Sequence, residues 1–206
     1  RSDEGAVFDY DYTFNCDEIT PQVTWGTSPE QVVGIDGQVP AAHQLDESRV
    51  GPGLDRAYEY MDLQPGTHVE GLEIAGAFIG SCTNGRLSDL KEAAKYLKGR
   101  QVAPGIMAIC TPGSMEVKKQ AEEAGIAQVF TDAGFEWREP GCSFCMSGGA
   151  GGESFEPSSR IISSTNRNFE GRQGRDVRSH LASPATVAWS AIHGKISDIR
   201  EFEELS

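Results

Sequence analysis

Cysteines are the residues of this 206-residue chain whose type and spacing point most directly to chemistry. Cys142 and Cys145 form a CxxC pair that follows Pro-Gly and precedes a run of Ser and Gly. Such a pair is a redox dithiol, half of a zinc site or part of an iron–sulfur site. A redox pair usually opens a helix, and no helix start is evident here, so a metal site is favoured. Cys16 and Cys110 form no second close pair of the kind that a four-cysteine zinc site needs, and we expect them to be buried or partly buried thiols.

The composition favours an acidic enzyme of a reducing compartment. The chain has 18 basic and 31 acidic residues and a net charge of −13. Proteins that bind nucleic acid or a membrane surface present a clustered basic face, which this sequence lacks. No apolar run reaches the length of a membrane span. An odd number of cysteines in a chain of this size is unlike a secreted disulfide framework. We therefore expect a cytoplasmic protein with neither a nucleic-acid nor a membrane partner.

The elements that must position the cysteines begin near residue 72. Apolar runs and helical spacing predict alternating strands and helices. The predicted strands are 73–80, 102–110, 127–131 and 160–164, and the predicted helices are 87–97, 115–124 and 184–193. This alternation is typical of an α/β fold with a mostly parallel sheet between helices on both faces, which makes three layers.

The predicted strands bring the reactive residues to one edge of the sheet. Cys82 follows the first strand, Ser114 the second, and residues 166–172 the fourth. In parallel sheets ligands bind at the carboxyl ends of strands, so we expect one site there. Ser114 is also the natural N-cap of the following helix, and this is the simpler interpretation of that residue.

Residues 1–70 form an irregular lead-in, and residues 71–206 form the α/β domain. The lead-in contains short extended candidates at 22–25 and 31–35 and a helix within 47–63. We expect it to pack on a neighbouring domain rather than to fold independently.

Five sequence motifs resemble those of a known family. They resemble the large subunits of 3-isopropylmalate dehydratase, in the aconitase superfamily, and they keep the family's order along nearly the whole chain. The motifs are FIGSCTNGRLSDL (78–90), DAGFEWREPGCSFC (132–145), STNRNFEGRQG (164–174), PQVTWGTSPE (21–30) and HLASPATVA (180–188).

The resemblance implies a three-layer aconitase-type domain that holds a [4Fe–4S] cluster. Its ligands would be Cys82, Cys142 and Cys145, the positions that match the family's cysteines. Three thiolates leave one iron without a protein ligand, and such an iron acts as a Lewis acid.

The resemblance also implies roles for two arginines and two asparagines. Arg167 and Arg172 match residues that hold substrate carboxylates, for which a guanidinium is well suited. The alternative is that either arginine pairs with Glu170 or another surface acid. Asn84 and Asn166 match positions beside the cluster, where they would hydrogen-bond to sulfur or to a bound oxygen. The alternative for Asn84 is a helix cap or a turn.

The implied activity is a hydro-lyase reaction that isomerises 2-isopropylmalate to 3-isopropylmalate in leucine biosynthesis. A separate small subunit, the swivelling domain, would be the partner. The acid and base residues are expected outside this chain, which corresponds to the C-terminal portion of a large subunit and is expected to be inactive alone. One alternative is homoaconitase or another hydro-lyase of the same family. The other alternative is a non-catalytic iron-responsive binding protein. The glycine-rich run after the cysteine pair departs from the family pattern and leaves the substrate side chain open.

Overall fold

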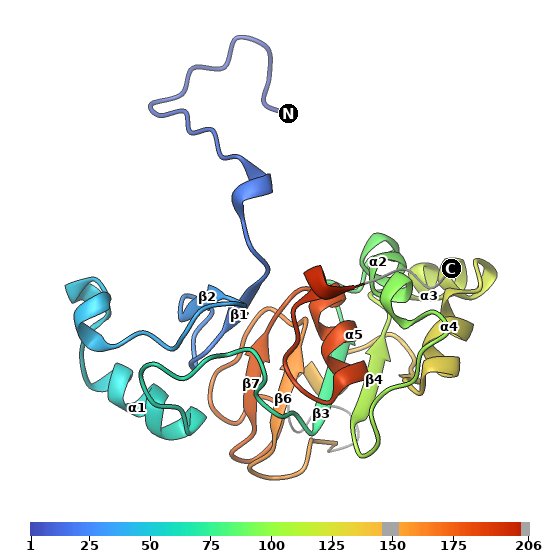
Figure 1. Ribbon diagram of the computed structural model, residues 1–206. Coiled ribbons are helices and arrows are strands. Elements are labelled where there is room, and N and C mark those ends of the chain that lie inside the picture. Colours follow the sequence, from blue (N-terminus) through green and yellow to red (C-terminus); the bar gives the residue numbers. More distant parts are fainter. Residues whose placement is uncertain (146–152, 203–206) are drawn as a thin grey trace.

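A five-stranded parallel sheet forms the centre of the molecule (Figure 1). The computed structural model describes residues 1–145 and 153–202, so most of the glycine-rich run after Cys145 lies outside the described part. The strand order is β5-β4-β3-β6-β7, and every neighbouring pair is parallel. The strands are β3 (Gly76–Gly80), β4 (Met107–Thr111), β5 (Glu136–Trp137), β6 (Arg160–Ser163) and β7 (Arg178–Leu181).

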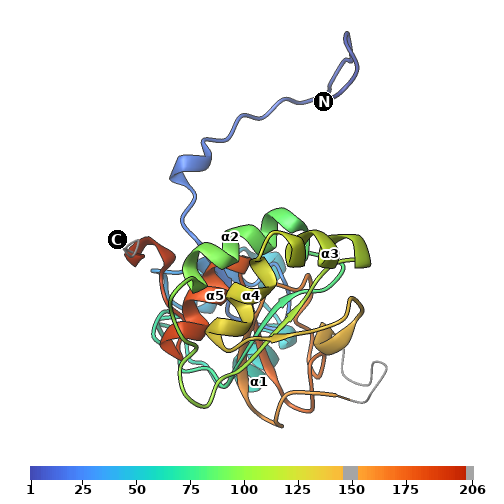
Figure 2. The ribbon, with the colours of Figure 1, turned by 90° about the vertical axis from the view of Figure 1, so that its right-hand side faces the viewer.

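Four helices cover one face of this sheet. Alternate side chains such as Ala77 and Ile79 of β3 and Cys110 of β4 point into a core that these helices complete. The helices lie together above the sheet in Figure 2. They are α2 (Leu87–Leu97), α3 (Met115–Glu123), α4 (Ile126–Ala133) and α5 (Pro184–His193).

The other face carries a second apolar cluster that connecting segments help to build. Phe78 of β3 and Ile161 of β6 are both fully buried there. In the described part they are covered by Phe144, Phe155 and Val177, which lie between strands and not on an α-helix. Because β3 is buried on both faces, its sequence is continuously apolar or small, as in other parallel sheets.

The predicted α/β class and parallel sheet are confirmed, but one predicted strand is wrong. Residues 127–131 belong to α4, a helix that buries Ile126, Phe130 and Ala133 on one face. This i, i+4, i+7 spacing is helical, and a glycine in the left-handed conformation flanks each end of the helix. The sequence analysis also missed β5 and β7. The strand β7 reads RSHL, and its buried His180 contacts the Thr24 carbonyl of the lead-in.

The lead-in has a small core of its own. It contains β1 (Gln22–Thr24), paired antiparallel with β2 (Val32–Gly34), and α1 (Pro52–Met61). These elements match the extended and helical segments predicted there. The residues that form this core are Trp25, Val39, Leu54, Ala57, Met61, Leu63 and Val69.

Polar contacts join the lead-in to β6 and β7. The Thr24 carbonyl lies 2.6 Å from Nδ1 of His180, and Arg160 donates to the Met61 carbonyl at 2.8 Å. The lead-in therefore packs on the α/β part of the same chain. The division at residue 70 stays a prediction.

Residues 1–19 extend away from this body (Figures 1 and 2). Their large apolar side chains are exposed, with Val7 at 96% and Tyr10 at 78%. Within the described part, no helix is both long and apolar enough to cross a membrane. Short 3₁₀ turns complete the list of elements: Cys16–Glu18, Ala42–Gln44, Glu47–Arg49, Ser143–Cys145 and Ile199–Glu201.

Candidate metal centre

The strand order places a topological switch point between β3 and β6. From β3 the chain continues to β4 on one side, and it later returns to β6 on the other side of β3. Loops that leave the carboxyl ends of two such strands diverge and open a crevice where ligands bind in α/β proteins. The loop after β3 carries Cys82 and Asn84, and the loop after β6 carries Asn166 and Arg167.

Hydrogen bonds tie these two loops together through Ser164. The Ser164 hydroxyl accepts from the backbone N–H of Gly80 at 3.0 Å, and the Ser164 carbonyl accepts from Nδ2 of Asn84 at 2.6 Å. Asn84 is in the left-handed conformation, with φ 57°. Its amide therefore stabilises the turn that presents Cys82, and it does not cap a helix.

Close backbone approach at the end of β3 requires glycine. A Cβ at Gly80 would lie 2.0 Å from the Thr111 carbonyl oxygen of β4, and one at Gly85 would lie 2.3 Å from the Ser81 carbonyl oxygen. Gly80 also has φ 104°, a conformation that residues with a Cβ rarely adopt. These glycines let the Cys82 loop fold tightly against the end of β4.

The cysteine pair lies on a single 3₁₀ turn after β5. The turn spans Ser143–Cys145, and the Cys145 N–H donates to the Cys142 carbonyl at 2.7 Å. Cys142 is exposed and Cys145 is buried. The pair therefore does not open an α-helix, in contrast to a typical redox pair.

Arg172 lies directly behind this pair. Arg172 is only 8% exposed, and it donates from Nε to the Cys145 carbonyl at 2.7 Å. Nη2 lies 2.9 Å from Sγ of Cys145 and 3.2 Å from Oδ1 of Asn166. Arg172 and Asn166, both predicted as site residues, are therefore brought together with one predicted ligand.

Arg167 is placed differently. Its side chain is exposed and donates from Nη1 to the Asn166 carbonyl at 2.7 Å. Among the described residues, neither Arg167 nor Arg172 pairs with Glu170 or with another acid, so that alternative is wrong. Glu170 binds Arg56 of α1 instead, through contacts of 2.9 and 2.8 Å.

The remaining cysteines do not join the candidate centre. Cys110 is fully buried in β4 and faces the helices, and burial raises the pKa of its thiol well above the usual value. Cys16 is exposed in the extended N-terminal segment. Cys110 is therefore the buried thiol that was expected, whereas the expectation of a buried or partly buried Cys16 is wrong.

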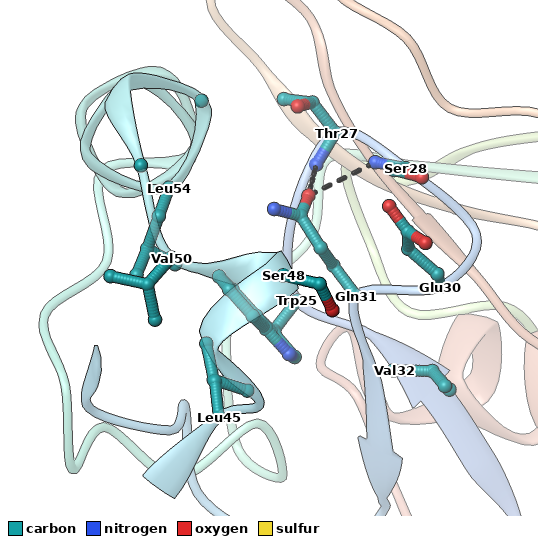
Figure 3. A pocket seen from close by; sticks show the side chains of 12 residues that line it. Trp25, Thr27, Ser28, Glu30, Gln31, Val32, Leu45, Ser48, Val50 and Leu54 are labelled. Carbon is teal, nitrogen blue, oxygen red and sulfur yellow. Dashed lines mark hydrogen bonds between the residues drawn. The ribbon is translucent and has the colours of Figure 1, made fainter. Parts of the chain in front are cut away.

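Two pockets are relevant to the candidate centre: one lies beside it, and the other lies away from it. One pocket of about 360 Å³ is lined by Asn84, Thr165 and the start of α5, so it adjoins the switch point. A second pocket of about 330 Å³ lies in the lead-in (Figure 3), between Trp25 and the segment around Leu45 and Val50. None of the predicted site residues lines the second pocket.

Comparison with known proteins now decides the family. The profile described as "Aconitase family (aconitate hydratase)" matches residues 1–194. The chain belongs to the aconitase family. It is 54% identical over 199 residues to the 3-isopropylmalate dehydratase large subunit of Cupriavidus necator, covering 97% of this chain and 74% of that relative.

Two further large subunits of the same name are longer. The large subunit 1 of Bradyrhizobium diazoefficiens is 49% identical, over 98% of this chain and 42% of its own length. That of Mannheimia succiniciproducens is 48% identical, over 99% of this chain and 42% of its own length. The chain thus spans less than half the length of these two relatives, and the resemblance seen in the motifs is confirmed.

The donor set of this aconitase-family chain fits an iron–sulfur group. Thiolates are the ligands that such clusters take, and two of the three predicted ligands, Cys82 and Cys142, are exposed. The buried hydroxyls of Ser81 and Ser143, each next to a predicted ligand, have no hydrogen-bond partner among the described residues. Buried polar groups are normally paired, so these hydroxyls are available to a bound group. Within 1–145 and 153–202, no three His, Cys, Asp or Glu side chains converge closely enough to hold a metal ion, so the fit lies in the type of donor, and Cys82, Cys142 and Cys145 are not gathered around one point.

Sequence reasoning missed several residues that shape this centre. Ser164 and Gln173 hold its loops through hydrogen bonds between their side chains and backbone groups. Arg56 forms an ion pair with Glu170. Ser164 and Gln173 lie within the STNRNFEGRQG motif, which was the only available signal. Arg56 lies 114 residues from its partner, and no local pattern reveals that pair.

Proposed function

We propose that this chain is the cluster-binding part of a hydro-lyase that isomerises 2-isopropylmalate to 3-isopropylmalate by dehydration and rehydration, in leucine biosynthesis. One observation carries the proposal: Cys82 and the Cys142–Cys145 pair lie on loops after β3 and β5 in a sheet of the aconitase family. The names of the relatives support the choice of substrate. A cytoplasmic location is part of the same proposal.

In this proposal Cys82, Cys142 and Cys145 hold a [4Fe–4S] cluster. When bound, the cluster supplies a Lewis-acid iron that has no protein ligand and that favours the departure of hydroxide. Arg172 keeps Cys145 in place and compensates the negative charge of its thiolate. Asn84 and Asn166 hold the surrounding loops, and Asn84 does so from the wall of the adjoining pocket.

Arg167 is the residue best placed to bind a substrate carboxylate. It is exposed at the switch point, and among the described residues its guanidinium makes one hydrogen bond, to the Asn166 carbonyl, which leaves its other N–H groups for a ligand. Dehydration also requires a base that removes a proton from the carbon adjacent to the one bearing the hydroxyl. We assign this base to a small-subunit partner or to other parts of a large subunit. The chain alone is therefore expected to be inactive.

Anaerobic reconstitution of the chain with iron and sulfide tests the ligand set. We expect broad visible absorption and about four irons per chain in the wild type. Cys82→Ser, Cys142→Ser and Cys145→Ser should each abolish iron retention, while Cys16→Ser and Cys110→Ser serve as matched controls and retain it. Tightly bound zinc without visible absorption, or full retention in Cys82→Ser, would contradict the proposal.

A hydratase assay tests the reaction. The reconstituted chain is assayed with and without a purified small subunit, and a complete large subunit serves as the positive control. Substrates are isopropylmaleate, aconitate and homoaconitate, so that a preference for homoaconitate would identify the homoaconitase alternative. Turnover by this chain without a partner would refute its assignment as a partial enzyme.

A further inference from the structure

Two consecutive residues, Arg172 and Gln173, hydrogen-bond to two consecutive backbone carbonyl groups in the turn that carries the cysteine pair. Arg172 donates to the carbonyl of Cys145 at 2.7 Å, and Gln173 donates from Nε2 to the carbonyl of Phe144 at 2.9 Å. The side chain of Gln173 is fully buried. The ligand turn is thus held from behind along its length.

Packing alone does not explain why the buried side chain of Gln173 is an amide. A buried amide is costly unless it is hydrogen-bonded, and an apolar side chain of the same size would fill the space at lower cost. Oε1 of Gln173 has no partner among the described residues, so the bond to Phe144 is the one that its side chain makes there. The hydrogen bond to the Phe144 carbonyl therefore accounts for an amide at this position.

The backbone of Gln173 is itself well fixed. Its carbonyl accepts from the N–H of Phe155 at 3.0 Å. The next residue, Gly174, has φ 145°, and a Cβ there would lie 2.9 Å from the Phe155 carbonyl oxygen and 2.7 Å from Val177. The amide of Gln173 is therefore presented from a rigid turn.

The ring of Phe144 holds the same turn from below. It packs against Phe78 and Phe155, with ring centroids 6.5 and 4.8 Å away. The guanidinium of Arg138 lies 4.9 Å from the centroid of the Phe144 ring, and Glu136 accepts from Arg138 at 2.9 Å.

A strained residue lies within the turn. Ser143 has φ 42°, a conformation that costs free energy in a residue with a Cβ and persists only when its surroundings impose it. The contacts of Phe144 and Gln173 provide those surroundings.

We propose that Gln173 is a positioning residue that fixes the Cys142–Cys145 turn before any metal arrives. By holding the Phe144 carbonyl it sets the path of the backbone between the two thiols. A prearranged ligand loop loses less conformational freedom when it binds, so metal uptake is favoured. The inference rests on the proposed function for its purpose, but its first test does not need a cluster.

The first test is the rate of thiol alkylation in the metal-free chain at fixed pH, followed by mass spectrometry of each cysteine. Gln173→Met keeps the volume and removes the donor, so we expect Cys145 to react about tenfold faster, as the loss of one hydrogen bond allows. Gln101→Met is the matched control, because Gln101 also donates from Nε2 to a backbone carbonyl, that of Asp132, but on the exposed surface. This control should leave Cys145 unchanged.

Cys110 reports whether the variant remains folded. It is fully buried, so equal acceleration at Cys110 and Cys145 would mean general unfolding. In that event the alkylation rates are measured in Gln173→Asn instead. Its shorter amide does not reach the Phe144 carbonyl, and the substitution perturbs the core less. An unchanged Cys145 rate in a folded Gln173 variant overturns the inference.

The second test is the rate of iron loss to a chelator after anaerobic reconstitution. Gln173→Met should lose iron about tenfold faster than the wild type and than Gln101→Met. If the wild type takes up no cluster, the proposed function fails, while the alkylation rates still decide the role of Gln173. If the wild type holds iron and Gln173→Met holds it equally well, the positioning role is wrong and the proposed function stands.

Discussion

His180 illustrates how burial determines the state of a single residue. It is fully buried in β7, with Nδ1 2.6 Å from the Thr24 carbonyl and Nε2 2.7 Å from Nη1 of Arg160. Arginine only donates, so Nε2 accepts, Nδ1 donates and the ring is neutral. Burial and then the charge of Arg160 lower the pKa of His180 to about 3, and the bond to Thr24 opposes them. Burial and the neighbouring Arg178 likewise lower the pKa of Arg160 to about 10, while Asp62 opposes this shift.

We predict that His180 makes the fold less stable in mild acid. The unfolded histidine takes up a proton below its usual pKa of 6.5, and the folded one stays neutral down to about 3. The stabilisation is therefore complete above pH 6.5 and is lost as the pH falls toward 3. From pH 7 to 5 the loss is about 2 kcal/mol. Urea titrations should give His180→Gln a flatter pH profile than the wild type, whereas the exposed His43→Gln should keep the wild-type profile. Identical slopes in His180→Gln and the wild type would refute this.

Arg167 and Arg172 were predicted to have the same role, and their surroundings separate them. Arg167 is exposed, whereas Arg172 is 8% exposed and contacts both the carbonyl and the sulfur of Cys145. Substrate binding is therefore assigned to Arg167 in our proposal, and support of a metal ligand to Arg172.

At the scale of elements, the end of β3 decides where Cys82 lies. Gly80 pairs with Thr111 across the β3–β4 register, and its backbone approaches the β4 carbonyl closely. No other residue type fits both this approach and the positive φ.

Gly80→Ala should therefore destabilise the chain by more than its φ alone explains. We expect a loss of about 3 kcal/mol or more in the free energy of unfolding, because the new Cβ would clash with backbone atoms. Gly105→Ala is the control, since Gly105 has φ 85° and nothing within 4 Å of a Cβ, and it should cost about 1 kcal/mol. Equal losses in the two variants, measured by urea unfolding, would show that the close approach at Gly80 is unimportant.

At the scale of the whole molecule, the chain consists of an α/β body, a lead-in packed on it and an extended N-terminal segment. The lead-in and the body share buried polar contacts through His180 and Arg160. Residues 1–19 make hydrogen bonds within the segment, such as that of the Ala6 N–H to the Asp3 carbonyl, and their apolar side chains are exposed.

Deletion of residues 1–19 should leave the thermal stability of the body unchanged. Exposed residues without tertiary contacts contribute little to folding free energy, so we expect a shift in Tm of less than about 2 °C by calorimetry. A decrease of more than about 5 °C would mean that the segment packs on the body in solution.

The sequence by itself determined the family and most of the regular elements, whereas its three cysteine ligands stay a prediction. The motifs are contiguous, and the strands and helices around Cys82 follow from apolar periodicity over a few residues. It misread residues 127–131 because a short apolar run fits a strand or a helix equally well. Only the tertiary structure revealed β7, whose buried His180 contacts Thr24 more than 150 residues away. It alone decided that Arg172 and Gln173 hold the cysteine turn, because hydrogen bonds between distant segments leave no periodic trace in the sequence.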